Sequence, residues 1–187
     1  MDAYVYLRVQ PGKVQNVVVE LAGKHGVRYA VAVIGDWDVM AAVEGADLLD
    51  IAKRILSQIH PIQGVVETYT APVVPLDRLG IHGGFALAPA PMQQRGDACY
   101  VHIEAEAGSV AQLVERLAEM EDVAGIAVIA GRHDLLVEIP QPWESATAVI
   151  LDNIHTLPGV VRTNTLAAVP RYEEEMEIDP DQPAPWS

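Results

Sequence analysis

The sequence has little sulfur and little positive charge. Cys99 is the only cysteine among 187 residues, so an internal disulfide is excluded and a reducing compartment is expected. Lysine and arginine total 12 against 26 aspartates and glutamates, which gives a formal net charge of −14. A surface with that charge repels phosphate backbones, and no run of basic residues forms a local patch. We therefore expect no direct binding to nucleic acid.

Long apolar runs and ligand-binding motifs are also missing. No stretch approaches the ~18 apolar residues that a membrane helix requires, and the first residues do not resemble a secretory signal. We expect a cytoplasmic protein that does not bind membranes. No paired cysteines, His-x-x-x-His pair or acidic cluster predicts a metal site, and no Gly-rich phosphate loop or Gly-x-Ser-x-Gly turn is found. The sequence therefore predicts no metal, no cofactor and no catalytic residue.

The sequence does contain a repeat of itself. The segment IHPIQGVVETYT at 59–70 recurs as IHTLPGVVRTNT at 154–165, with seven of twelve positions identical. The turn sequence GDWD at 35–38 recurs as GRHD at 131–134. The offset is 96 residues in the first part of each copy and 95 in the last part. That spacing is too long for a solenoid repeat and indicates a duplicated domain.

Each copy predicts the same order of elements. A strand with alternating apolar residues precedes a helix whose apolar residues recur every three or four positions. Two apolar strands then flank a glycine turn as a hairpin, and a second helix and a last strand follow. In copy two, Ser109 and Gln112 predict a capping box at the first helix. The predicted bounds in copy one are, in order, 4–9, 14–21, 27–34, 39–43, 48–59 and 65–74.

The order βαββαβ is that of the ferredoxin-like fold, an antiparallel sheet with two helices on one face. We therefore predict an α+β protein of two tandem ferredoxin-like domains. The predicted division is 1–75 for the first domain, 76–96 for a Pro/Gly/Ala-rich linker, 97–170 for the second domain and 171–187 for an acidic mobile tail.

The face of each predicted sheet that lacks helices carries ring side chains. These are Tyr4 and Tyr6 in copy one, and Tyr100 and His102 in copy two. Tyrosine and histidine combine an apolar body with a polar tip, so they suit an interface better than open water. We expect the two open faces to pack on each other, within one chain or between chains, as in a dimeric α+β barrel.

The repeated motifs resemble those of the effector-binding domain of Lrp/AsnC-type regulators, also called the RAM domain. That domain is βαββαβ, with a Gly-x-aromatic-Asp turn between strands two and three and a Gly-Val-x-x-Thr-x-Thr run into strand four. Here GDWD and GRHD match the turn, and GVVETYT at 64–70 and GVVRTNT at 159–165 match the run. The sequence departs from the family pattern in having His133 at the aromatic position of copy two. Because Ala3 already lies in the first predicted strand, we expect no helix-turn-helix domain before copy one.

The resemblance implies an effector-binding protein without its own DNA-binding domain, whose partners are a small effector, further copies of itself or a partner regulator. In the family the effector is often an amino acid, bound near the turn between strands two and three. Glycine allows close backbone approach to a carboxylate, aspartate pairs with an ammonium group, and threonine hydroxyls add hydrogen bonds. The predicted ligand-binding residues are Gly35, Asp36, Trp37, Asp38, Thr68, Thr70, Gly131, His133, Asp134, Thr163 and Thr165.

Other interpretations stay open from the sequence. The glycines and aspartates are also typical of hairpin turns, and the threonines are good strand formers. At the level of the chain, one alternative is an enzyme of the dimeric α+β barrel type, either a chlorite dismutase-like haem protein or a cofactor-poor monooxygenase. His102 or His155 would then be the haem ligand or the base. The other alternative is a structural subunit of a regulator assembly.

Overall fold

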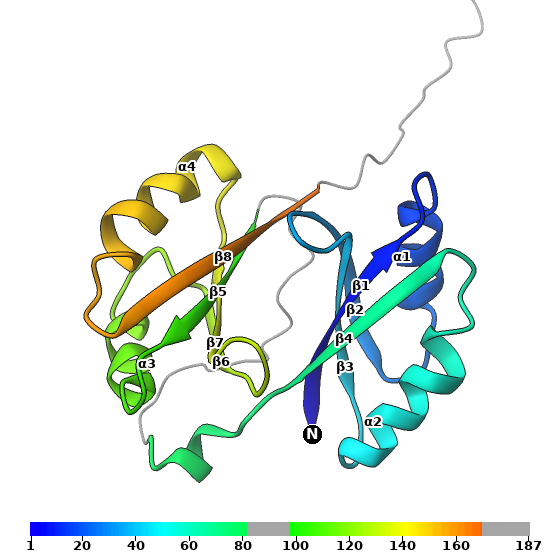
Figure 1. Cartoon of the computed structure of the whole chain (residues 1–187), viewed down its shortest axis with the longest axis horizontal. Helices are drawn as coiled ribbons and strands as arrows, with labels where there is room; N and C mark the ends of the chain where they lie inside the picture. Colours follow the sequence, from blue (N-terminus) through cyan, green and yellow to red (C-terminus); the bar gives the residue numbers. More distant parts are fainter. Residues whose placement is uncertain (82–97, 170–187) are drawn as a thin grey trace, which may run out of the picture.

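A computed structural model describes residues 1–81 and 98–169 of the chain. The first half runs β1, α1, β2, β3, α2, β4, and the second half runs β5, α3, β6, β7, α4, β8 (Figure 1). In the first half the bounds are Asp2–Val9, Val14–Ala22, Val27–Ile34, Val39–Glu44, Leu48–Arg54 and Val65–Pro72. In the second half they are Cys99–Ala105, Val110–Ala118, Gly125–Val128, Leu135–Ile139, Trp143–Ala148 and Val160–Ala168. The predicted order βαββαβ is confirmed in both copies.

Some local details differ from the predictions. The second helix of each half ends in a π-helical turn, Ile55–Ile59 after α2 and Val149–Ile154 after α4, and a 3-10 helix, Leu76–Leu79, follows β4. The predicted capping box is wrong. Ser109 precedes α3, but its backbone is already helical (φ −90°, ψ −12°) and its side chain makes no capping hydrogen bond. Most of the predicted linker, and the predicted tail, lie outside the described residues.

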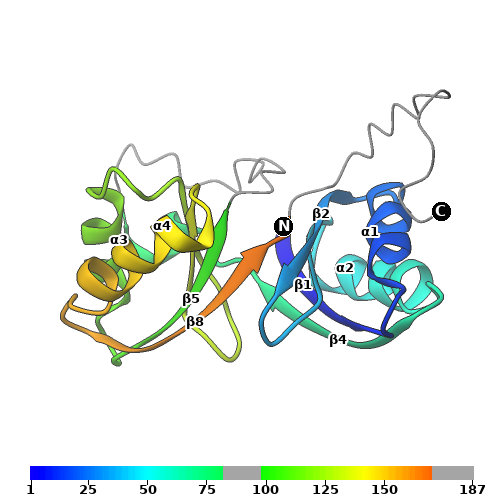
Figure 2. The same ribbon diagram turned by 90° about the horizontal axis from the view of Figure 1, so that it is seen from above.

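The eight strands form one antiparallel sheet in the order β4-β1-β3-β2-β8-β5-β7-β6. β2 of the first half pairs with β8 of the second half, through Val33 opposite Ala168. The two outer strands also meet, because Val73 forms a bridge with Ile129 and the Val74 N–H donates to the Val128 carbonyl at 2.8 Å. The sheet is therefore closed into a barrel within one chain, with the helices of each half outside it (Figure 2).

The barrel interior forms a core of its own. Between each sheet half and its helices lies an aliphatic core, whereas the interior core is rich in aromatic residues. Tyr4, Tyr6, Tyr100 and His102, which were predicted on the open faces, are all buried there. The expected packing of the two open faces is confirmed, and it occurs within one chain. The halves are also hydrogen-bonded edge to edge, which the sequence did not predict. No helix in the described ranges has the length and apolar character needed to cross a bilayer.

Candidate functional site

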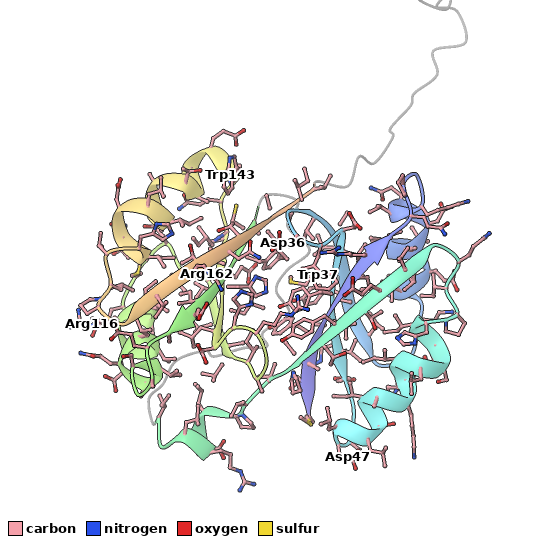
Figure 3. All side chains as sticks on the ribbon, in the orientation of Figure 1. Asp36, Trp37, Asp47, Arg116, Trp143 and Arg162 are labelled. Carbon is pink, nitrogen blue, oxygen red and sulfur yellow. The ribbon has the colours of Figure 1, made fainter. Side chains whose placement is uncertain are left out.

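A small polar pocket lies inside the barrel where the two halves meet. We call it the axial pocket, and its lining residues are Tyr6, Arg8, Asp36, Trp37, Tyr69, His102, Arg132, His133 and Asn164. Figure 3 shows Asp36 and Trp37 between the halves, whereas Asp47, Arg116 and Trp143 lie at the periphery. The cavity volume is about 60 Å³. Drug-sized ligands occupy roughly 300–1,000 Å³, so this pocket accommodates the polar end of a small molecule and does not enclose a macrocycle such as haem.

The pocket lies on the axis that relates the two halves. Tyr6 and His102 are counterparts, 96 residues apart in the repeat. The Tyr6 hydroxyl oxygen is 2.8 Å from Nε2 of His102, and the two rings meet edge to face with centroids 5.0 Å apart. Counterparts in a pseudo-twofold structure contact each other only at the axis. The position of this contact therefore identifies the pocket as a site made once per chain, by both halves together.

Two arginines are held on aromatic rings at the pocket. The Arg8 guanidinium lies 5.3 Å from the centroid of the Trp37 ring, and the Arg132 guanidinium lies 5.1 Å from that of Tyr69. The Trp37 and Tyr69 rings are stacked on each other, with centroids 6.1 Å apart and planes 16° apart. Cation–π contacts of this kind contribute about 0.5–1 kcal/mol at exposed sites. The Arg132 guanidinium has no ion-pair partner among the described residues, whereas Nε of Arg8 lies 3.6 Å from a carboxylate oxygen of Glu67.

Two histidines in the pocket are uncharged near neutral pH. His102 is 3% exposed, and burial, helped by the neighbouring His133, lowers its pKa to about 4. The rings of His102 and His133 lie 4.9 Å apart, and burial is also the main cause that lowers the pKa of His133. Nδ1 of His102 has no hydrogen-bond partner among the described residues. Burial raises the pKa of the Tyr6 hydroxyl, so Tyr6 stays protonated beside it.

The rim of the pocket carries opposite charges at counterpart positions. Asp36 and Arg132 are counterparts, and so are Asn164 and Tyr69. The Asn164 side-chain amide donates to Oδ2 of Asp36 at 2.8 Å, and the Arg132 main-chain N–H donates to the Tyr69 hydroxyl at 2.6 Å. In each half, the turn between the second and third strands therefore contacts the last strand of the other half. The groups that make this contact differ between the two halves.

Three of the predicted site residues line the axial pocket, namely Asp36, Trp37 and His133. The two turn aspartates are used elsewhere. The Asp38 carboxylate accepts a hydrogen bond from the Val9 N–H at 2.7 Å, and Asp134 accepts one from Ala105 at 2.8 Å. Both N–H groups lie at the irregularity where the first strand of each half shifts register. These contacts agree with the structural interpretation of the two aspartates.

The predicted threonines lie on the other side of the sheet. Thr68 and Thr163 stand opposite Leu7 and Ile103, which belong to the helix-side cores, and Thr70 and Thr165 likewise oppose helix-side residues. Directly opposed residues share a face of the sheet. The hydroxyl of Thr68 is 2.9 Å from Nε2 of the exposed His60, and Thr163 makes the same contact with His155 at 2.6 Å. The structure therefore does not bring the threonines or His155 to the axial pocket.

The two turn glycines make room for the neighbouring half. Gly35 and Gly131 adopt φ of +146° and +149°, a region that disfavours other residues. A Cβ on Gly35 would lie 2.6 Å from Cδ2 of Leu166, and one on Gly131 would overlap the hydroxyl of Tyr69. Both glycines are needed for the turns to approach the last strand of the other half, so their role is to place the pocket residues.

Six lining residues were not among the predicted ligand-binding residues. Tyr6 and His102 were predicted only as residues of the open faces, with His102 also a haem ligand or base in the enzyme alternative, and Arg8, Tyr69, Arg132 and Asn164 were missed altogether. Three of them occupy the variable positions of otherwise matching motifs. Arg132 replaces aspartate within GxxD, and Tyr69 and Asn164 are the middle residues of TYT and TNT. These three positions are marked in the sequence by a difference between the two copies within otherwise identical motifs. Within 1–81 and 98–169, no group of three or more His, Cys, Asp or Glu is placed to hold a metal ion.

Comparisons with known proteins agree with this architecture. The model of the Lrp/AsnC ligand binding domain matches residues 2–75 and 98–178. The siroheme decarboxylase NirDL aligns at 12% identity and a TM-score of 0.65, covering 91% of this chain and 71% of that one. A putative chlorite dismutase aligns at 11% identity and a TM-score of 0.51, covering 90% of this chain and 94% of that one. These two likenesses show the fold, and the predicted ferredoxin-like, dimeric α+β barrel class is confirmed.

A hypothetical protein from Pyrococcus horikoshii is 26% identical, with a TM-score of 0.36. That alignment covers 37% of this chain and 83% of the other. No curated protein matches the chain.

Proposed function

The chain belongs to the family of Lrp/AsnC ligand-binding domains, and we propose that it is a regulatory protein that binds a small carboxylate-bearing effector, of the amino acid class, in the axial pocket. The observation that carries this proposal is the pair of guanidinium groups, Arg8 and Arg132, held on the faces of Trp37 and Tyr69 at the pocket. Arginine presents several donors in a planar fork that matches a carboxylate.

The local charge supports an anionic group. The whole chain has 12 basic residues against 26 acidic ones, yet the pocket is lined by two arginines and one aspartate, and its histidines are uncharged at neutral pH. Arg132 forms no ion pair with any described residue. Nε of Arg8 lies 3.6 Å from Oε2 of Glu67, and both of these side chains are about half exposed. A carboxylate in the pocket would therefore gain charge-assisted hydrogen bonds without displacing a strong ion pair.

The size and surroundings of the pocket favour a small molecule. About 60 Å³ suits the carboxylate end of an amino acid, and the Trp37 and Tyr69 rings offer apolar surface to the rest. Because the overall charge of −14 disfavours direct contact with DNA, we propose that the bound state acts through a partner regulator or a further copy of the chain.

A thermal-shift screen of the twenty amino acids tests the proposal. At a hundred times its dissociation constant, a ligand stabilises the native state by about 2.7 kcal/mol, which raises the melting temperature measurably. We expect at least one amino acid to do so, and Arg132→Gln and Arg8→Gln to reduce the shift strongly. Arg116→Gln, on the outer surface of α3, is the matched control and should respond like the wild type. No shift with any amino acid, or full shifts in both pocket variants, would refute the proposal.

One observation favours catalysis as a second candidate function. His102 is buried and uncharged, its Nδ1 has no partner among the described residues, and the Tyr6 hydroxyl lies beside its other nitrogen. An uncharged imidazole can accept a proton from a bound molecule, although a pKa of about 4 makes His102 a weak base at neutral pH. The fold itself does not decide between binding and catalysis. Incubating each stabilising amino acid with the protein and following it by NMR separates the two: chemical change with the wild type, and none with His102→Gln, would establish an enzyme.

A further inference from the structure

The two halves differ at every counterpart pair that lines the axial pocket. Around the pocket the turn glycines, turn aspartates and strand threonines are identical between the copies. Within it, four counterpart pairs are complete and all four are unlike: Tyr6 with His102, Asp36 with Arg132, Trp37 with His133, and Tyr69 with Asn164. A homodimer would present each group twice about its axis. Here the axis relates two sides of different chemistry.

One counterpart pair of the lining differs in the sign of its charge. Arg132 lies on the Tyr69 ring, and its counterpart in the first half is the acidic Asp36. Arg8, on the Trp37 ring, has as its counterpart Glu104, which pairs with Arg162 and does not line the pocket. At the positions of Asp36 and Arg132 the pseudo-twofold axis therefore relates a negative group to a positive one.

The opposite charges in the pocket are not paired with each other. Asp36 and Arg132 both line it and both belong to the described part of the chain, yet no ion pair joins them. Asp36 Oδ2 accepts from Asn164, and the Arg132 guanidinium lies on the Tyr69 ring. Among the described residues Oδ1 of Asp36 has no hydrogen-bond partner. Both residues are exposed, so a molecule at the pocket would meet a cation at Arg132 and an anion at Asp36.

We infer that each chain binds one dipolar molecule in one orientation, with its carboxylate facing Arg132 and its ammonium group facing Asp36. The inference rests on the proposed function and adds to it the stoichiometry, the orientation and the need for both charged groups. The repeat suggests two sites, one at each turn between the second and third strands. The inference replaces them with one site on the pseudo-twofold axis. It also moves the cation-binding role from Asp38, whose carboxylate holds the Val9 N–H, to Asp36.

The probes for the test are L-alanine and its two halves, propionate and ethylamine. In calorimetric titrations we expect L-alanine to bind once per chain and at least tenfold more tightly than either half, because only L-alanine meets both charges. Charge-assisted hydrogen bonds contribute about 1.5–3 kcal/mol, so Asp36→Asn should weaken L-alanine roughly ten- to a hundredfold and leave propionate nearly unchanged. Arg132→Gln should weaken both L-alanine and propionate.

Exchanging the charges of Asp36 and Arg132 is the most stringent part of the test. Asp36→Arg alone leaves only cations at the pocket, and Arg132→Asp alone leaves Arg8 as its one cation, so each should weaken L-alanine at least tenfold. The double variant restores opposite charges with reversed direction, so it should recover at least tenfold over either single variant as L-alanine binds in the opposite orientation. Glu115→Arg with Arg116→Glu, on the outside of α3, is the matched double control and should bind like the wild type. Circular dichroism establishes that each variant is folded.

The outcomes separate this inference from the proposed function. Two molecules of L-alanine per chain, propionate bound as tightly as L-alanine, or a folded double variant no better than the single ones would overturn the inference. Each of these results leaves carboxylate binding by the arginines in place. If neither L-alanine nor any other amino acid binds the wild type, both the proposed function and the inference are wrong.

Discussion

The two halves carry the same ion pair with its charges exchanged. In the first half Arg8 on β1 pairs with Glu67 on β4 at 3.6 Å, and in the second half Glu104 on β5 pairs with Arg162 on β8 at 2.8 Å. Glu104 is the counterpart of Arg8 and Arg162 is the counterpart of Glu67. Each half therefore has an ion pair between its first and last strands. The positive charge is on the first strand in the first half and on the last strand in the second half. The pair is thus present in both halves with opposite polarity.

Other contacts repeat without change. Asp38 and Asp134 hold the same backbone position of their own first strands, and His60 and His155 contact Thr68 and Thr163 in the same way. All of these contacts lie within one half. Contacts that differ lie both between halves, such as Tyr6 with His102, and within a half, such as the ion pairs of Arg28 with Asp2 and Glu44, for which the second half has alanine at position 124. The repeated contacts therefore hold each half together in the same way, whereas the contacts at the seam where the halves meet are asymmetric.

The largest expected effect comes from the interior residue Leu166, which is fully buried, and its counterpart Ala71. Leu166→Ala should lower the free energy of unfolding by about 2–5 kcal/mol, because it removes packing inside the barrel. Ala71→Leu should cost about 1–3 kcal/mol by overpacking. Urea denaturation measures both. The combined exchange should recover part of the lost unfolding free energy, because the pseudo-twofold axis relates the two positions.

The matched control is Leu151→Ala on the outer surface, where the side chain is 52% exposed, and it should change stability little. Losses in the combined exchange that equal the sum of the single losses would show that the two halves are not interchangeable at the seam.

The next effect is a loss of stability in acid, which arises from His102 in the second half. Burial lowers the pKa of His102 from 6.5 to about 4, so between these values the unfolded chain binds a proton that the native chain does not. Stability should therefore fall as the pH drops from about 6.5 to 4, by about 3 kcal/mol if His102 acts alone. His102→Tyr introduces the residue found at the counterpart position, Tyr6, and should remove much of this dependence in urea titrations across pH.

The control for the pH experiment is Leu151→Ala, which removes no titratable group and should leave the slope against pH unchanged. A wild type whose stability is flat between pH 6.5 and 4, or an unchanged slope in His102→Tyr, would contradict the assignment of the uncharged state to His102.

The smallest of the three effects concerns the turn aspartates, where the halves should respond alike. Asp38→Ala and Asp134→Ala each remove a hydrogen bond between a carboxylate and a backbone N–H, worth about 1.5–3 kcal/mol. We expect similar losses of unfolding free energy in both variants, and an undiminished affinity for whichever amino acid the thermal-shift screen identifies. A variant that keeps wild-type stability and loses affinity would return its aspartate to the ligand-binding role.

Much of the fold was predictable because its signals are local. Apolar periodicity predicts each strand and helix of βαββαβ, and the repeat predicts that it occurs twice. The ring side chains of the open faces, Tyr4 and Tyr6 among them, predict that the two faces meet. The pairing of β2 with β8 was not predictable, because an edge-to-edge register between distant segments leaves no local pattern.

The candidate site was predictable only in part for the same reason. The family turn drew attention to positions 35–38, and within it Asp36 and Trp37 line the pocket while Asp38 turns back to its own strand. Successive strand residues point to opposite faces, so Tyr69 reaches the interior and Thr68 does not. Which turn residue meets which strand of the other half depends on the seam, and this is a property of the assembled barrel.

The bridge between Val73 and Ile129, together with the pairing of β2 with β8, also has a consequence for concentration. When two separate subunits build a barrel of this kind, the fraction assembled falls on dilution, and with it every site on the axis. In this chain the two halves are covalently linked, so their association is intramolecular. Their effective concentration is set by the linkage between them and does not depend on the protein concentration. The axial pocket is therefore complete in a single molecule at any dilution, and the strand edges that a lone half would expose are already paired.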